Sequence, residues 1–171
     1  MAGRPDLYAV ALGSNRRHGR HGAPERVVAA AIAAMADAGL TILAVSPTLT
    51  TPPIGPSIRR FANAAALIET ALPPAALLAR LKTIERDFGR RRGQRWGARV
   101  IDLDIILWSG GLWASPTLSI PHRAFCTRDF VLFPLERIAP DWIDPLGNRS
   151  IRQLAARLRR RRPVDRPATR P

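Results

Sequence analysis

The sequence has very little cysteine, lysine or tyrosine, and it has no long run of apolar residues. Its one cysteine, Cys126, cannot form an internal disulfide, and with three histidines it is too little for a closed structural zinc site. No apolar run reaches the roughly 20 residues of a membrane span, and the first residues lack a secretory signal pattern. We therefore expect a cytoplasmic protein with neither a membrane segment nor disulfide or zinc staples.

Two common nucleotide-binding motifs are also missing. The chain contains neither G-x-x-x-x-G-K-[ST] nor G-x-G-x-x-G, which gives no support to a P-loop or dinucleotide-binding enzyme. Its 171 residues, 46% of them apolar, suffice for one compact core. We expect one domain over residues 1–160 and a disordered Arg/Pro-rich tail over residues 161–171, because the tail has almost nothing to bury.

Arginine supplies nearly all of the positive charge. The chain has 27 basic and 13 acidic residues, for a net charge of +14, and Lys82 is the only lysine. Residues 157–171 hold seven arginines and one aspartate, and residues 82–99 hold seven basic and two acidic side chains. This balance predicts an anionic ligand and leaves a basic nucleic-acid-binding protein open as an alternative.

The apolar pattern predicts strands and helices in alternation. Strands are expected over residues 7–12, 41–50, 61–70 and 100–108, and helices over residues 25–38, 74–88 and around 151–158. Together they predict an α+β sandwich in which helices cover a central mixed or antiparallel sheet. The turn after the first strand is expected to begin at Gly13, and His18 and His21, in an arginine-rich run, are expected to be solvated.

The strongest chemical signal is Asp102-Leu103-Asp104. On a strand, both aspartates face one side, while Ile101, Leu103, Ile105 and Leu107 face the other. Two carboxylates facing one volume repel each other, and hard oxygen ligands of this kind favour Mg²⁺. Five arginines lie just upstream, and their guanidinium groups can clamp phosphate oxygens: Arg90, Arg91, Arg92, Arg95 and Arg99. The combination favours phosphoryl transfer over two solubilising surface charges.

Several segments, in order along the chain, resemble the 6-hydroxymethyl-7,8-dihydropterin pyrophosphokinases, the HPPK family. They are YAVALGSN (8–15), TPPIGP (51–56), FANA (61–64), ERDFGR (85–90), RWGARVIDLDIIL (95–107) and residues 120–135. The resemblance implies a ferredoxin-like three-layer α+β sandwich. It also implies transfer of diphosphate from ATP to 6-hydroxymethyl-7,8-dihydropterin in folate biosynthesis, giving AMP and using two Mg²⁺ ions. We expect no obligate protein partner.

The same resemblance implies a role for each matching residue. Asp102 and Asp104 match the ligands of both Mg²⁺ ions, and Arg90, Arg92 and Arg99 complete the catalytic set. The implied ATP-binding residues are Lys82, Glu85, Arg90, Arg92, Arg99, His122 and Arg128. The implied pterin-binding residues are Thr51, Pro53, Ile54, Phe61, Asn63, Trp96 and Phe130. Phe61 and Phe130 could sandwich a flat ring, and Asn63 offers its amide edge both a donor and an acceptor.

Overall fold

The structure is a computed structural model that describes residues 5–51, 60–89 and 100–161. Its centre is an antiparallel sheet in the order β2-β4-β1-β5, with the short strand β3 also paired to β4. The strands are β1 (Asp6–Ser14), β2 (Thr41–Val45), β3 (Leu49–Thr51), β4 (Phe61–Thr70) and β5 (Asp102–Trp108). Strand β5 forms one edge of this sheet.

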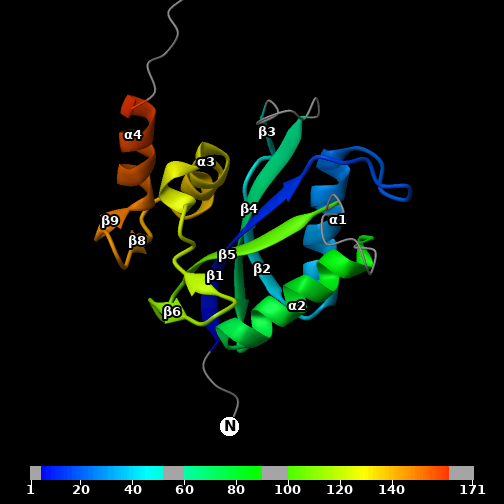
Figure 1. Cartoon of the computed structure of the whole chain (residues 1–171), viewed down its shortest axis with the longest axis horizontal. Helices are drawn as coiled ribbons and strands as arrows, with labels where there is room; N and C mark the ends of the chain where they lie inside the picture. Colours follow the sequence, from blue (N-terminus) through cyan, green and yellow to red (C-terminus); the bar gives the residue numbers. More distant parts are fainter. Residues whose placement is uncertain (1–4, 52–59, 90–99, 162–171) are drawn as a thin grey trace, which may run out of the picture.

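Helices cover both faces of the sheet (Figure 1). One face carries α1 (Pro24–Asp37) and α2 (Pro74–Asp87), and the other carries α3 (Asp129–Ile138), against which α4 (Ile151–Arg161) packs on the side away from the sheet (Figure 1). Two small hairpins and a 3-10 helix (Phe125–Thr127) complete the described chain: β6 (Trp113–Ala114) with β7 (Ser119–Ile120), and β8 (Ile143–Asp144) with β9 (Arg149–Ser150). The expected α+β class, with helices over an antiparallel sheet, is confirmed.

Local sequence sets the limits of α1 and α2. Each helix has a proline in its first turn, where a missing N–H costs nothing. Each is followed by a glycine at positive φ, Gly39 at 83° and Gly89 at 101°. Glycine is the usual residue there, because a side chain strains the left-handed conformation that ends the helix.

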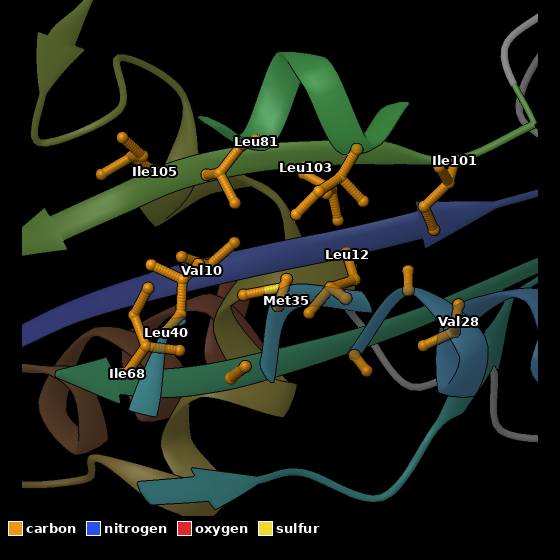
Figure 2. Packing of buried hydrophobic residues seen from close by; sticks show 14 of the residues in the cluster. Val10, Leu12, Val28, Met35, Leu40, Ile68, Leu81, Ile101, Leu103 and Ile105 are labelled. Atoms are coloured by element: carbon orange, nitrogen blue, oxygen red, sulfur yellow. The ribbon is translucent and has the colours of Figure 1, made fainter. Parts of the chain in front are cut away.

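The larger core lies between the sheet and helices α1 and α2. Alternate residues of β1, Tyr8, Val10 and Leu12, point into it, as the two-residue period of a strand requires. Figure 2 shows side chains from three strands and both helices meeting in this layer, among them Val10, Leu12, Met35, Ile68, Leu81, Leu103 and Ile105.

The opposite face of the sheet carries small side chains. Ala9, Ala11 and Ala65 point toward α3, which fills this layer with Val131 and Leu132. Because these side chains are small, α3 can lie close to the sheet. At the end of the strands, small side chains leave open space above the sheet, and the candidate site described below lies there.

One expectation for β5 is wrong at its end. Ile101, Leu103 and Ile105 lie in the larger core as predicted, but Leu107 lies in the α3 layer with Ile106. The pairing with β1 shifts between Ala9 and Val10, so one extra residue of β5 is inserted there. Such a bulge moves the following side chains to the other face.

The interpretation of His18 and His21 as solvated is also wrong. Both are half-buried, their rings stack with centroids 4.7 Å apart, and His21 stacks on Phe88 at 5.1 Å. Main-chain N–H groups of Arg20 and His21 donate to the Nδ1 atom of His18, which closes this turn.

Within the described residues, none of the helices combines the length and apolar character needed to cross a bilayer.

Tyr8 ties the start of the sheet to the segment before α2. It is fully buried, and its hydroxyl donates to the Leu72 carbonyl at 2.7 Å. Burial, helped by the Asp6 carboxylate, raises the pKa of Tyr8 from 10.0 to about 12. As the pH rises, the Tyr8 hydroxyl ionises in the unfolded chain before it ionises in the folded protein. The stability that protonated Tyr8 contributes is therefore complete below the unfolded pKa and is lost as the pH rises toward 12.

Replacing Tyr8 with Phe should lower the free energy of unfolding at neutral pH by about 1 kcal/mol, since the Leu72 carbonyl loses its donor. It should also remove the part of the alkaline destabilisation that Tyr8 causes. Denaturant unfolding over a pH series measures both effects. Tyr8 is the only tyrosine, so tyrosinate absorbance reports its pKa directly; a pKa close to that of free tyrosine would contradict the prediction.

Candidate active site

The candidate site is built by the register of three strands. Gly13 of β1 pairs with Asn63 of β4 on one side and with Asp102 of β5 on the other. Two residues earlier in β1, Ala11 pairs with Asp104 of β5. Because alternate residues share a face, Asn63, Asp102 and Asp104 all lie on the α3 side of the sheet.

Small residues of β1 keep the space between these side chains open. A Cβ atom added at Gly13 would lie 3.3 Å from Oδ1 of Asn63, which is tighter than an ordinary contact. Gly13 belongs to β1, whereas the sequence predicts that it begins the following turn. Sequence analysis assigns Gly13 no role in the site, because only the pairing with β4 and β5 reveals what Gly13 faces.

The result is a cleft of about 510 Å³ over the ends of β1, β4 and β5. Its lining combines three kinds of group: the two carboxylates, the Asn63 amide, and the aromatic rings of Phe61 and Phe130. Arg128, the residue just before α3, adds a guanidinium whose carbon lies 5.9 Å from the centre of the Phe130 ring. Segments that are separated by 24 to 48 positions in the sequence thus line one space.

His122 lies beside this group without lining the cleft. Its main-chain N–H donates to the Ile106 carbonyl at 3.0 Å, which holds it against β5. Burial lowers the pKa of the His122 imidazole; the Asp104 carboxylate opposes this shift and the Arg128 guanidinium adds to it. His122, Asp104 and Arg128 are therefore close enough to influence one another electrostatically.

Lys82 and Glu85 lie on the α2 side of β5. Glu85 is buried, with 3% of its surface exposed, and its Oε1 atom accepts a hydrogen bond from the Leu103 N–H at 2.8 Å. The Lys82 ammonium lies 2.6 Å from the same oxygen and 3.5 Å from the Leu103 carbonyl oxygen. Neither residue is part of the cleft lining.

The carboxylate pair suits Mg²⁺, which needs few protein ligands, better than it suits a metal ion whose ligands all come from the protein. Among the residues that the structure describes, no group of three or more His, Cys, Asp or Glu side chains could hold an ion. Asp102 and Asp104 supply only oxygen ligands at the border of an open cleft. Mg²⁺ commonly uses one or two carboxylates and completes its octahedron with water and phosphate oxygens, which this donor set permits.

The structure brings together six of the sixteen residues to which the resemblance assigns a role. Asp102, Asp104, Phe61, Asn63, Arg128 and Phe130 share the cleft. Six further candidates lie outside the described residues: Pro53, Ile54, Arg90, Arg92, Trp96 and Arg99. Thr51 pairs with Phe61 at the end of β3, and only its backbone is described.

Residues 9–140 match the family of 7,8-dihydro-6-hydroxymethylpterin-pyrophosphokinases (HPPK). Two bacterial relatives carry the name 2-amino-4-hydroxy-6-hydroxymethyldihydropteridine pyrophosphokinase. The Pseudomonas aeruginosa protein is 41% identical over 86% of this chain and 89% of its own length. The Methylorubrum extorquens protein is 40% identical over 70% of this chain and 75% of its own length. The chain belongs to the HPPK family.

Solved structures agree on the fold. A crystal structure of Plasmodium falciparum HPPK-DHPS with pteroate superposes with a TM-score of 0.68 at 14% identity, covering 90% of this chain. The match spans 42% of the Plasmodium chain, so this chain corresponds to less than half of that protein.

The grouping of His122 with Asp104 and Arg128 can be tested by NMR titration in the absence of divalent cations. Asp104→Asn should lower the pKa of His122 further, because a negative charge that favours the imidazolium is lost. Arg128→Gln should raise it, because a repelling positive charge is lost. The signal is assigned by its absence in His122→Asn, and an unchanged pKa in both charge variants would show that the three side chains do not converge.

Proposed function

We propose that the protein transfers diphosphate from ATP to the hydroxymethyl group of 6-hydroxymethyl-7,8-dihydropterin, a reaction of folate biosynthesis. Membership of the HPPK family and the names of the bacterial relatives support the reaction. The observation that carries the proposal for this chain is the cleft itself, which puts two carboxylates and a guanidinium beside an amide and two aromatic rings. Neither the comparisons nor the described residues favour the nucleic-acid alternative.

The pterin end of the cleft is assigned to Phe61, Asn63 and Phe130. A flat bicyclic ring fits between aromatic side chains, where stacking and burial of apolar surface stabilise it. The Asn63 amide can donate to a ring carbonyl and accept from a ring N–H, so that it selects the pterin edge. Burial of Asn63, which is 5% exposed, means that these bonds form away from competing water.

The phosphate end is assigned to Asp102, Asp104, Arg128 and His122. Asp102 and Asp104 would hold two Mg²⁺ ions, which would supply neutralisation of the phosphate charge. Arg128 binds phosphate oxygens through its planar donors, and His122 donates to them from its Nε2–H. Following the resemblance, we also assign Arg90, Arg92 and Arg99 to the phosphates, and Thr51, Pro53, Ile54 and Trp96 to the pterin. The resemblance places Lys82 and Glu85 on the nucleotide side, but neither lines the cleft, so we do not assign them to the nucleotide.

Chemistry in this arrangement is a direct displacement. The hydroxymethyl oxygen forms a bond to the β-phosphorus while the bond from that phosphorus to the α-phosphate oxygen breaks, releasing AMP and a proton. Phe61, Asn63 and Phe130 fix the pterin so that its hydroxymethyl group points toward the carboxylates, which supplies orientation as the main catalytic contribution.

We also propose that the fold is ferredoxin-like and that residues 1–160 form the catalytic unit, with the arginine-rich tail playing no part. The order β1-α1-β2-β4-α2-β5 and the sheet order β2-β4-β1-β5 support the first statement.

The proposed reaction is tested by incubating the protein with ATP, Mg²⁺ and the dihydropterin. Pterin-dependent formation of AMP supports it, whereas ADP or no product contradicts it.

Asp102→Ala and Asp104→Ala should each lower turnover by roughly 10³-fold, as expected when a main stabiliser of transition-state charge is lost. Without ligands, Asp104→Ala should keep the melting temperature of the wild type, because removing one of two like charges relieves repulsion. The rise in melting temperature on adding Mg²⁺ and ATP should largely disappear. Asp37→Ala, at the exposed end of α1, is the control; near-normal turnover of both cleft variants at saturating Mg²⁺ would rule out the metal assignment.

Asn63→Ala should raise the KM for the dihydropterin by roughly 10- to 100-fold, because a buried pairing with the ring edge is lost. The KM for ATP should change little. Steady-state kinetics with each substrate varied in turn measures the two constants. Asn148→Gly, which removes an exposed amide at a positive φ of 49°, serves as control; equal increases in both KM values would instead indicate that Asn63 supports the fold.

A further inference from the structure

Leu103 separates the two cleft aspartates, and its backbone faces away from the sheet. Within residues 5–51, 60–89 and 100–161, strand β5 lies at the edge of the sheet and pairs only with β1. In an antiparallel pair, alternate residues direct both their N–H and C=O groups to the partner strand, and the residues between them direct both groups outward. The Leu103 N–H and C=O point outward, because α2 side chains and not β1 meet them.

Glu85 and Lys82 take the place of a neighbouring strand at this point. The Glu85 Oε1 atom accepts from the Leu103 N–H at 2.8 Å, and the Lys82 ammonium faces the Leu103 carbonyl at 3.5 Å. The first contact holds the peptide unit between Asp102 and Leu103. The second holds the peptide unit between Leu103 and Asp104. The whole backbone from one aspartate Cα to the other is therefore restrained from the α2 side.

Stability alone does not explain a carboxylate at this place. Glu85 falls on the core-facing row of α2 with Leu77 and Leu81, and only 3% of it is exposed. Burying an ion pair usually gains little over an apolar residue of similar size, because both charges lose water. A glutamate in this row is better explained by the bond that it makes to β5.

The partner of Glu85 is the single lysine of the chain. Of 27 basic residues, 26 are arginine. An ammonium is compact and can approach the Glu85 oxygen and the Leu103 carbonyl together, whereas a planar guanidinium needs more room and donates along fixed directions. The one exception to the use of arginine thus occurs where a small cation fits.

We propose that Glu85 and Lys82 are positioning residues of the diphosphate-transfer site: they clamp the backbone on both sides of Leu103 and so set the spacing and direction of the Asp102 and Asp104 carboxylates. The inference rests on the proposed function. It differs from direct contact with the nucleotide, because the clamp acts from the α2 side of β5 and is complete in the protein alone.

The test compares three substitutions in α2. Glu85→Gln keeps an oxygen that can accept from Leu103, Glu85→Leu removes it, and Lys82→Met removes the ammonium while keeping the apolar stem. Arg86→Met, on the exposed side of the same helix, is the control. Amide hydrogen exchange of Leu103 is measured first, without nucleotide, pterin or metal.

In Glu85→Leu, exchange at Leu103 should accelerate by roughly ten- to hundredfold, the effect of losing a charge-assisted hydrogen bond. The Mg²⁺ concentration for half-maximal turnover should rise by about 10- to 100-fold, as is usual when a group behind a metal ligand is removed. The KM for the dihydropterin should stay unchanged. Glu85→Gln should restore most of both properties, Lys82→Met should show a smaller change of the same kind, and Arg86→Met should match the wild type.

Two results would overturn the clamp. Normal Leu103 exchange in Glu85→Leu with a raised KM for ATP alone would make Glu85 a nucleotide ligand. A lower melting temperature with an unchanged Mg²⁺ requirement would make it purely structural. If Glu85→Leu does not fold, Lys82→Met decides by the same two measurements. Leu103 exchange is read without substrates, so its outcome stands even if the wild type forms no AMP and the proposed function fails.

Discussion

The register of β1 against its two neighbours is the constraint on which the site depends. It places Asn63, Gly13 and Asp102 in one row across three strands. Adjacent strands lie about 4.8 Å apart, so the Cα atoms of Asn63 and Asp102 are separated by roughly 10 Å with only a glycine between them. In the proposed reaction the pterin and the phosphates meet above that glycine. A slip of one residue in either pairing would turn one of these groups to the opposite face.

The alternation of apolar and polar residues predicts the strands of this row well. It fails where the pairing between strands decides which face a side chain occupies. The alternation in residues 101–105 correctly places Asp102 and Asp104 on the face opposite Leu103. Beyond Ile105 the sequence reads Ile106-Leu107, and two consecutive apolar residues carry no sign of a bulge. Whether Leu107 faces α2 or α3 follows from the shift against Ala9 and Val10, which is a property of the paired strands.

The contact of Glu85 with β5, on which its proposed positioning role rests, cannot be predicted from the sequence for a related reason. The spacing of Leu77, Leu81 and Ile84 predicts the buried stripe of α2, and Glu85 is the polar exception on it. Propensity and periodicity cannot tell which strand lies under that stripe or whether its backbone is already paired. Those facts follow from the sheet order, which places β5 at the edge and leaves Leu103 in need of partners.

An edge strand exposes backbone groups that can pair with another chain, and proteins generally cover or interrupt such edges. Here the covering groups belong to the residues around the site. Glu85 accepts a hydrogen bond from the Leu103 N–H, and Lys82 donates one to the Leu103 carbonyl. The His122 N–H donates to the Ile106 carbonyl at 3.0 Å. The contacts that satisfy the edge also bring α2 and the segment at His122 against the strand of the two aspartates. Because the strand of the two aspartates lies at the edge, side chains of α2 can reach its backbone. The contacts that cover this edge against other chains are also the ones that, in our proposal, position the two carboxylates.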